Sequence, residues 1–322
     1  MTKLIKSKVI FPDVNEKLGL GLGMDLPWGE EIGFKSFNNG DSITPKMKKF
    51  FSEYENEFNY IFFAFQPKNR NFLNSQDYFD AYDTLFKEVP NIKARAMHQT
   101  ILNMAAVENY DKKDIIKFTN EIIDRYDIKW IVEDLGLWSI KGKTVPFPLP
   151  PYLTDAGLKA CINNINEYKD GLNVPVCIEF PGFTEGTNFF IGNMDGFDFF
   201  KTLTEETNTP VTIDIGHILS YQWLKGNQGK DMFKGLEKLP FDNCFELHLS
   251  GCQIIKGKFR DLHHGILLNE QIELLEYLLP RCPNLKAVTY EDPQYSSEGI
   301  LIPKSQKNYN KMKELVEAWK LQ

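Results

Sequence analysis

Eight β-type runs alternate with eight helical stretches along this chain, and that alternation limits the possible fold more than any other feature. Strict alternation predicts parallel strands joined by crossover helices, and eight such units favour a closed barrel over an open doubly wound sheet. The β-type runs lie at 17–23, 58–65, 92–98, 128–134, 174–180, 210–216, 244–250 and 285–291. The helical stretches lie near 45–56, 76–88, 112–126, 155–169, 195–207, 229–238, 268–280 and 306–320.

We therefore expect an α/β fold, a single-domain (β/α)8 TIM barrel over residues 1–322, with an N-terminal extension at 1–16 and a C-terminal helix at 306–322. The Pro-rich segment 146–151 follows a strand and precedes a helix, so we expect a stiff βα loop there rather than a domain linker. The glycines at 19, 21 and 23 resemble a phosphate loop, but their spacing does not fit one. We expect them to let the barrel pack closely.

Composition and charge exclude several classes of protein. No stretch reaches the ~18 consecutive apolar residues of a membrane span, and residues 1–8 are not followed by the apolar run of a secretory signal. A net charge of −7 without a basic stripe argues against a nucleic-acid partner. The five cysteines show no pairing pattern, which predicts reduced thiols in a cytoplasmic protein.

Histidines and carboxylates gather at the ends of the predicted strands. In a barrel, the active site lies at the carboxyl ends of the strands, so these side chains are expected to meet. Imidazole and carboxylate together suit iron, manganese or zinc, and the set exceeds the ligands of one octahedral ion, which predicts two or three ions. The candidate metal ligands are His98, Glu133, Asp134, Glu179, Asp214, His217, His248, Asp261, His263 and Glu291.

Each candidate has a simpler alternative. A lone acid at a strand end is often a helix cap, and a lone histidine is often hydrogen-bonded within a core; here their convergence favours metal. Cys252 is either a thiolate near the site or a small buried apolar residue. Glu246 shares a strand face with His248 and is expected to orient it. We expect catalytic roles for Glu291, His248 and Asp261. Substrate contacts or core packing are expected for Trp138, Phe147, Phe180 and Phe183.

Several short runs, taken together, resemble the multinuclear non-haem iron-dependent oxidases, a family that includes the methanobactin maturase. The resemblance covers about residues 90–292. The runs that carry it are WIVEDL at 130–135, PFPLPPYLT at 146–154, CIE at 177–179, MDGFDF at 194–199, VTID at 211–214, ELHLSG at 246–251, DLH at 261–263 and TYE at 289–291.

The resemblance implies two or three irons (Fe2+ or Fe3+) in the barrel, dioxygen as co-substrate, and oxidation of a residue, chiefly cysteine, in a ribosomally made precursor peptide. It also implies a partner protein that presents the peptide. Three positions depart from the family pattern: Asp134 stands at a ligand histidine, and Phe180 and His217 stand at asparagines. The implied iron ligands are His98, Glu133, Glu179, Asp214, His248, Asp261, His263 and Glu291.

Two other functions remain open from the sequence. The run 214–217 (DIGH) resembles a strand end of the xylose-isomerase-like barrels, which would imply a divalent-metal sugar isomerase or epimerase with Glu179 and Glu291 as the acid/base pair. A catalytically idle barrel that binds a peptide through its Pro-rich segment and aromatic side chains is the third reading.

Overall fold

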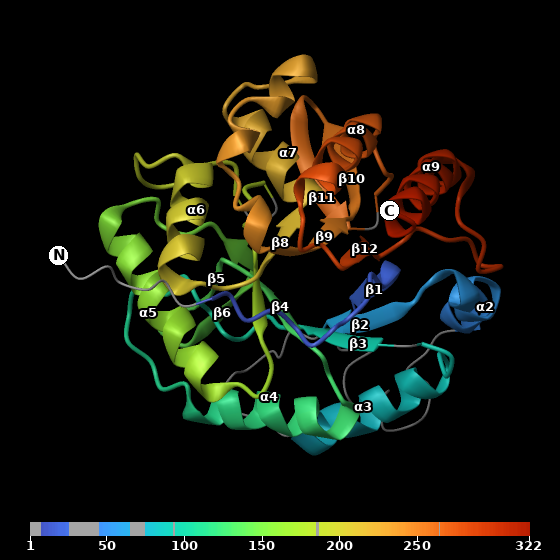
Figure 1. Ribbon diagram of the computed structural model, residues 1–322, viewed down its shortest axis with the longest axis horizontal. Coiled ribbons are helices and arrows are strands. Elements are labelled where there is room, and N and C mark those ends of the chain that lie inside the picture. The colour runs from blue at the N-terminus through green and yellow to red at the C-terminus, as the bar shows by residue number, and fades with distance from the viewer. Residues whose placement is uncertain (1–7, 26–44, 65–74, 93, 185–186, 264) are drawn as a thin grey trace.

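The computed structural model describes residues 8–25, 45–64, 75–92, 94–184, 187–263 and 265–322. Its centre is a closed barrel with strand order β1-β12-β9-β8-β7-β4-β3-β2, and every neighbouring pair is parallel (Figure 1). The predicted (β/α)8 TIM barrel is confirmed. Its strands are β1 (Gly19–Asp25), β2 (Tyr60–Ala64), β3 (Ala94–His98), β4 (Ile131–Asp134), β7 (Val176–Glu179), β8 (Val211–Asp214), β9 (Cys244–Leu249) and β12 (Ala287–Glu291).

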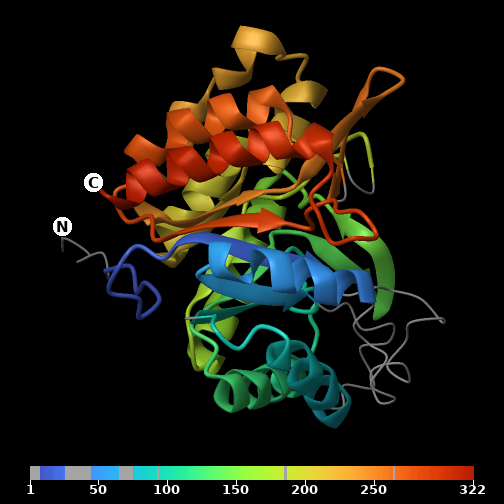
Figure 2. The ribbon, with the colours of Figure 1, turned by 90° about the vertical axis from the view of Figure 1, so that its right-hand side faces the viewer.

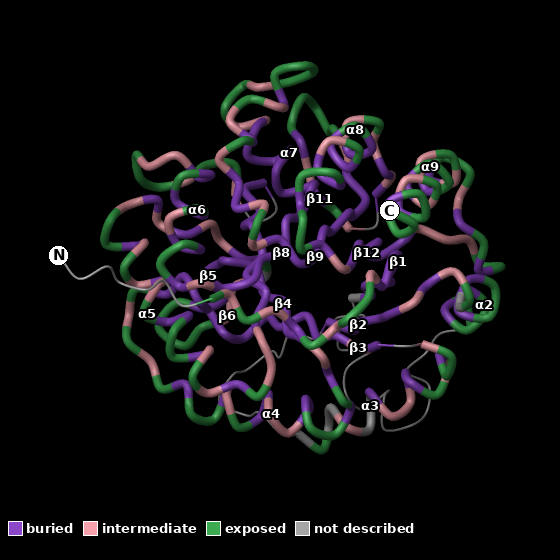
Figure 3. Tube along the Cα trace, in the orientation of Figure 1, coloured by how far each residue is buried: buried purple, intermediate pink, exposed green. Residues whose placement is uncertain are grey.

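Helices surround the barrel, and the burial of the chain follows this layering: the central strands are buried and the outer helix faces are exposed (Figure 3). In Figure 2 the described chain begins and ends on the side opposite the carboxyl ends of the strands. None of the described helices combines the length and the apolarity that crossing a bilayer requires. The α-helices are α2 (Pro45–Tyr54), α3 (Ser75–Lys87), α4 (Lys113–Tyr126), α5 (Asp155–Gly171), α6 (Gly196–Thr207), α7 (Ile215–Leu224), α8 (Asn269–Leu278) and α9 (Pro303–Lys320).

Alternate residues of each strand point into the barrel, which separates an apolar floor from a polar mouth. The floor includes Tyr60, Phe62 and Trp130, which are buried inside the barrel. A Cβ atom at Gly21 would lie 2.1 Å from the Tyr60 ring, and one at Gly23 would lie 2.4 Å from the Phe62 ring. The glycines of β1 therefore make room for these rings, as expected from the sequence.

The helix predicted at 229–238 is wrong. The helix that follows β8 is α7, which begins directly after Asp214, while 229–238 holds two short 3-10 helices, η3 (Gly229–Phe233) and η4 (Leu236–Lys238). The Asp214 side chain accepts a hydrogen bond from the backbone N–H of His217 and so caps α7. Gly226, Gly229 and Gly235 have positive φ values, which are incompatible with a continuous helix over the later segment.

Two β-hairpins extend the connections beyond the barrel strands, and both correct the sequence interpretation. The Pro-rich segment is not simply a loop, because it enters β6 (Lys143–Leu149), which pairs with β5 (Leu137–Ile140). The run 261–263 lies on β11 (Lys258–His263), which pairs with β10 (Gly251–Ile255), and neither strand is among the eight predicted β-type runs. Each hairpin turns at a Lys-Gly pair, Lys141-Gly142 and Lys256-Gly257, in which both residues have positive φ. This conformation is typical of a type I′ turn.

Candidate metal centre

Eight buried side chains at the mouth of the barrel form four overlapping groups whose possible ligand atoms lie within 4.8 Å of one another. Six come from the ends of the barrel strands β3, β4, β7, β8, β9 and β12, one comes from the first turn of α7 and one from β11. Five are carboxylates and three are imidazoles. Period-two alternation places the members on barrel strands on the inner face, at the carboxyl ends of those strands. The members are His98, Asp134, Glu179, Asp214, His217, His248, Asp261 and Glu291.

Glu179 lies at the centre of this cluster and belongs to three of the four groups. One carboxylate oxygen, Oε2, is 3.1 Å from Nε2 of His98. The other, Oε1, is 3.4 Å from Nδ1 of His248 and 3.6 Å from Nδ1 of His217. Glu291 Oε1 lies 3.2 Å from the same Nδ1 of His248. Glu179 is therefore placed to bridge neighbouring cations.

Asp214, His217 and Asp261 form the remaining group. The Ser250 hydroxyl donates a hydrogen bond of 2.6 Å to Oδ1 of Asp261 and fixes that carboxylate. A Cβ atom at position 216 would lie 2.1 Å from Oδ2 of Asp261, so only a glycine leaves space for it. The first turn of α7 thus supports the cluster by having no side chain at Gly216.

Without a cation, burial and neighbouring charges shift the pKa values of several groups in the cluster away from their usual values. Burial raises the pKa of Asp214 to about 8, and the neighbouring Asp261 charge adds to that rise while His217 opposes it. Burial alone would lower the pKa of His98, but its hydrogen bond and attraction to Glu179 raise that pKa to about 9. Burial opposes ionisation of Glu179, yet His248 and His98 hold its pKa well below the usual value. Without a cation, protons on Asp214 and His98 therefore offset part of the negative charge that bound cations would otherwise neutralise.

The donor set fits metal ions. Among the described residues, Oδ2 of Asp214, Oδ2 of Asp261 and both ring nitrogens of His248 are buried without a hydrogen-bond partner. Leaving such atoms unsatisfied costs about 1–3 kcal/mol each, which coordination would remove. Five ionised carboxylates would bury five negative charges, and two or three divalent ions would supply about +4 to +6.

Glu246, expected to orient His248, lies one layer deeper on β9 and is fully buried. Its carboxylate accepts hydrogen bonds from Trp130 Nε1 at 2.7 Å, from the Thr289 hydroxyl at 2.5 Å and from the Tyr60 hydroxyl at 3.1 Å. Its Oε1 also lies 3.3 Å from Nε2 of His248. This contact directs Nδ1 of His248 toward Glu179 and Glu291, so Nδ1 is the nitrogen placed for a cation.

The resemblance implied Glu133 as an iron ligand, but the structure places its neighbour Asp134 in the cluster instead. Asp134 belongs to the cluster, with Oδ1 3.6 Å from Nδ1 of His217. Glu133 points to the opposite face of β4 and accepts hydrogen bonds from the backbone N–H groups of Ile101, Leu102 and Asn103. Trp130 lies inside the barrel, so two-residue alternation along β4 is the signal that selects Asp134.

His263 lies apart from the four groups. Its backbone has a φ of 55°, and its Nδ1 is 3.0 Å from Oδ2 of Asp292. Asp292 is 1% exposed and was not singled out from the sequence, although it directly follows Glu291. The neighbouring His264 lies outside the described residues. Burial raises the pKa of Cys252 well above its usual value, which favours the neutral thiol.

The aromatic residues expected to contact substrate lie in different places. Phe180 is fully buried and packs between β7 and the helices, with ring centroids 5.9 Å from Phe183 and 5.4 Å from Phe197. Since Glu179 points inward, the next residue points outward, and Phe180 and Phe183 serve the core. The backbone oxygen of Phe180 accepts a 2.7 Å hydrogen bond from His217 Nδ1. Trp138 is buried on β5, while Phe147 on β6 is 56% exposed.

Residues 55–306 match the model of a family described as RiPP precursor modification enzyme MbnB/TglH/ChrH, where RiPP denotes a ribosomally synthesised, modified peptide. The chain belongs to this family. As a RiPP precursor modification enzyme, it acts on a peptide, and its family agrees with the resemblance drawn from the sequence runs. No curated protein matches the sequence significantly.

Solved structures similar to this RiPP precursor modification enzyme share its fold. A GH5 cellulase from an Icelandic hot spring isolate has a TM-score of 0.50 at 15% identity, covering 94% of this chain and 89% of the other. A xylose isomerase-like TIM barrel protein from Mycobacterium smegmatis, in complex with magnesium, has 0.49 at 11%, covering 93% and 97%. D-psicose 3-epimerase from Clostridium cellulolyticum H10 has 0.45 at 12%, covering 94% and 96%. At these identities the similarity concerns the barrel alone.

Proposed function

We propose that this protein is an iron- and dioxygen-dependent oxidase that modifies a cysteine of a ribosomally made precursor peptide. One observation carries the proposal: the buried cluster of five carboxylates and three imidazoles around Glu179. Mixed nitrogen and oxygen donors of this number suit two or three iron ions. A partner protein that presents the peptide, and action in the cytoplasm, belong to the same proposal; the five free, buried cysteines agree with a reducing compartment.

The residues of the cluster divide the work. Glu179 would hold more than one ion, because its two oxygens face different imidazoles. Asp134 and His217, which stand at family ligand positions or beside them, supply donors in the same group and so preserve a site with altered ligands. Glu291, His248 and Asp261 are proposed as the catalytic ligands nearest the reacting groups. Iron, when bound, supplies electrons to dioxygen and lowers the pKa of a thiol that coordinates to it.

The chain also excludes water and holds geometry. His248 is fully buried, and Glu246 beneath it fixes which ring nitrogen faces the mouth. The Ser250 hydroxyl holds Asp261 against α7. Preorganised ligands of this kind keep the site rigid while the peptide thiol is positioned above it.

The test combines metal analysis with turnover. The full-length protein is reconstituted with Fe2+ without oxygen, analysed for metal content, and then exposed to air while its absorption is followed. Cysteine-containing peptides are added, and oxygen uptake and peptide mass are measured. Two or more irons, an absorption change in air, and oxidised peptide are the expected results.

Variants sharpen the outcome. His248→Ala and Glu291→Ala are expected to lose both iron and turnover, while Glu276→Ala on the exposed face of α8 keeps both. Iron and full activity retained in either cluster variant would remove the assignment. A single manganese, magnesium or zinc ion with sugar turnover would indicate an isomerase instead, and no metal at all would indicate a peptide-binding barrel.

A further inference from the structure

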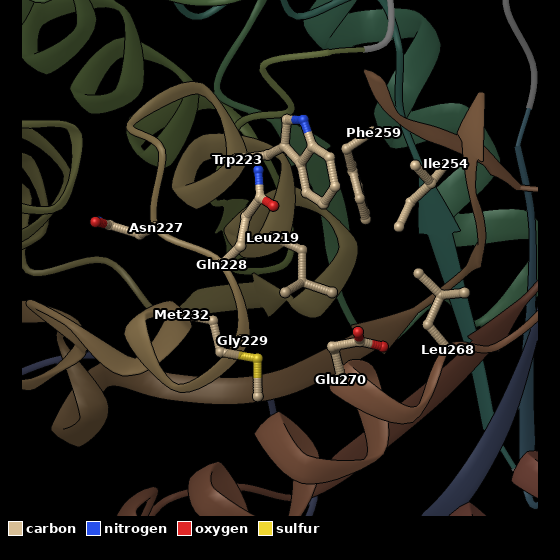
Figure 4. Close-up of a pocket in the computed structure, with 10 residues that line it drawn as sticks. All are labelled: Leu219, Trp223, Asn227, Gln228, Gly229, Met232, Ile254, Phe259, Leu268 and Glu270. Carbon is tan, nitrogen blue, oxygen red and sulfur yellow. The ribbon is translucent and has the colours of Figure 1, made fainter. Parts of the chain in front are cut away.

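A groove of about 200 Å3 lies beside the barrel mouth, between α7, the 3-10 helix η3, the β10–β11 hairpin and the start of α8. Figure 4 shows Trp223, Phe259 and Ile254 along one side of it, with Leu268 and Glu270 on the other. Its volume is below the ~300–1,000 Å3 that is usual for small-molecule and cofactor sites. A groove of this size and apolar lining suits one large side chain of a bound peptide.

The walls of the groove continue into the metal centre. On α7, His217 belongs to the cluster and Trp223, six positions later, lines the groove. On β11, Asp261 belongs to the cluster and Phe259, two positions earlier on the same strand face, lines the groove. The rings of Trp223 and Phe259 lie 6.0 Å apart, centroid to centroid. Whatever occupies the groove therefore rests on the same elements that hold the cluster.

The rim above the groove is apolar and positively charged, in a chain whose net charge is −7. Ile254 and Ile255 on the hairpin are 51% and 44% exposed. Lys256 and Lys258 at the hairpin tip are exposed, and they form no ion pair with the described part of the chain. The β5–β6 hairpin repeats this combination, with exposed Ile140 beside Lys141 and Lys143.

The two lysine-tipped hairpins follow β4 and β9, so they flank the sector of the barrel that holds β7 and β8. Figure 2 shows the β10–β11 hairpin projecting past the carboxyl ends of the strands. A chain that crosses the mouth between the hairpins would pass over Glu179 and Asp214. The single carboxylate in the groove, Glu270, is placed to accept a hydrogen bond from a peptide N–H.

We propose that this groove is a recognition site for an unmodified, acidic and apolar segment of the precursor peptide: one large apolar side chain fills the groove, and neighbouring Asp or Glu residues face Lys256 and Lys258. The inference rests on the proposed peptide substrate. Six helical residues separate Trp223 from His217, a rise of about 9 Å, and an extended peptide spans about 3.3 Å per residue. The anchoring residue thus stands at least about three positions from the residue that reacts.

The test uses a displayed library of random dodecapeptides selected on the full-length, iron-loaded protein. Enriched peptides should combine an aromatic or branched aliphatic residue with nearby Asp or Glu. The most enriched peptide is synthesised and its affinity is measured. We expect Trp223→Ala, Ile254→Asp and Lys256→Glu/Lys258→Glu each to weaken its binding by about tenfold or more. Added salt should weaken binding to the wild type and have less effect on the charge-reversed variant.

Matched controls lie on other faces of the molecule. Ile10→Asp changes an apolar residue that is 72% exposed, and Lys159→Glu/Lys201→Glu changes two exposed lysines on α5 and α6. Both are expected to leave peptide affinity within about twofold of the wild type. The metal content of every variant should equal that of the wild type, because none of these residues lies in the cluster.

Several binding results would overturn the proposed recognition site. Absence of enriched peptides, enrichment of basic peptides, or equal binding by groove and control variants would remove the recognition site. A wild-type dimer that Ile254→Asp converts to a monomer would make the groove a contact between copies. If peptides bind the groove but iron-dependent oxidation is absent, the proposed reaction fails while the site stands. If the groove variants oxidise the peptide with an unchanged KM, the proposed recognition site fails while the proposed reaction stands.

Discussion

Replacing Glu246 by glutamine separates the charge of this residue from its hydrogen bonds. The carboxylate accepts from Trp130 Nε1 on one oxygen, and from the Tyr60 and Thr289 hydroxyls on the other. A glutamine can keep its carbonyl toward the indole and direct its amide toward the two hydroxyls, because hydroxyl oxygens accept as well as donate. The fold should therefore tolerate Glu246→Gln, whose stability we expect within about 2 kcal/mol of the wild type.

The effect should appear at the metal instead. The amide nitrogen that replaces Oε1 cannot attract an N–H group at Nε2 of His248, which lies 3.3 Å from that oxygen. Loss of such a partner typically weakens metal binding 10–100-fold, or about 1.4–2.7 kcal/mol. Two of the four groups lack His248, so only the ion beside this ring should weaken while others stay bound. Glu246→Ala is less informative, because it would leave the Trp130 indole and one of the two hydroxyls, which can still bond to each other, unpaired at a cost of about 1–3 kcal/mol each.

The assay is a titration of metal-free protein with Co2+ or Fe2+ against a competing chelator, with urea unfolding of the same samples. Thr289→Val is the matched control: it removes one hydroxyl from Glu246 but keeps the carboxylate charge, and it should leave the affinity within about threefold. Wild-type affinity at every site in Glu246→Gln, or an equal loss in Thr289→Val, would refute the role given to this carboxylate.

Three further predictions concern the cluster and its surroundings. Gly216→Ala would place a Cβ atom 2.1 Å from Oδ2 of Asp261, so we expect the loss of at least one ion and about 1–3 kcal/mol of stability; an unchanged metal content by elemental analysis would contradict this. Glu133→Gln should lower stability in urea by about 1–3 kcal/mol, because an amide nitrogen cannot accept the backbone N–H bonds, and metal content should be unchanged; a lost ion would return Glu133 to the ligand set. In metal-free protein, the pKa of His98 is raised from 6.5 to about 9, so its stabilisation is present below pH 6.5 and is lost as pH rises toward 9, on the order of 3 kcal/mol. Urea unfolding across this range should show the decline, and iron should reverse its direction, since coordination requires the neutral ring; a flat profile without metal would disprove the pairing of His98 with Glu179.

Much of the fold could be predicted from the alternation of β-type runs and helical stretches along the sequence. The eight strands appear in their predicted order because each is a short apolar run between helical stretches, and a closed barrel is the compact arrangement of eight such units. The helix after β8 was missed for a local reason. Asp214 ends a strand and caps a helix at once, so the boundary carries no loop that a pattern could reveal.

The hairpins had a signal that periodicity overlooked. The same four residues, Ile-Lys-Gly-Lys, occur at 140–143 and at 255–258, and both copies form the turn of a hairpin. Glycine at the second turn position accepts positive φ without strain, and lysine at the first turn position adopts φ values of 49° and 51°. This short repeat flanked by β-type residues is the sequence signal of the two turns, and it was not used in the prediction.

The sequence predicted the cluster as a group but not each of its members. Eight of the predicted ligands do lie together, but choosing between Glu133 and Asp134 for the inner face required the parity of β4, which Trp130 reveals by pointing inward. The pairing of His263 with Asp292 could not be read from spacing, because it depends on positive φ values at both residues.

The two carboxylate oxygens of Asp214 face different partners, and this couples the metal cluster to the rigidity of α7. Oδ1 accepts a hydrogen bond from the backbone N–H of His217 in the first turn of α7, whereas Oδ2 faces the cluster without a partner among the described residues. A cation that keeps this carboxylate ionised also makes Oδ1 a stronger hydrogen-bond acceptor for the first turn of the helix. Loading the barrel with metal should thereby stiffen α7 to its last turn, where the indole of Trp223 would report the change as a shift in its fluorescence.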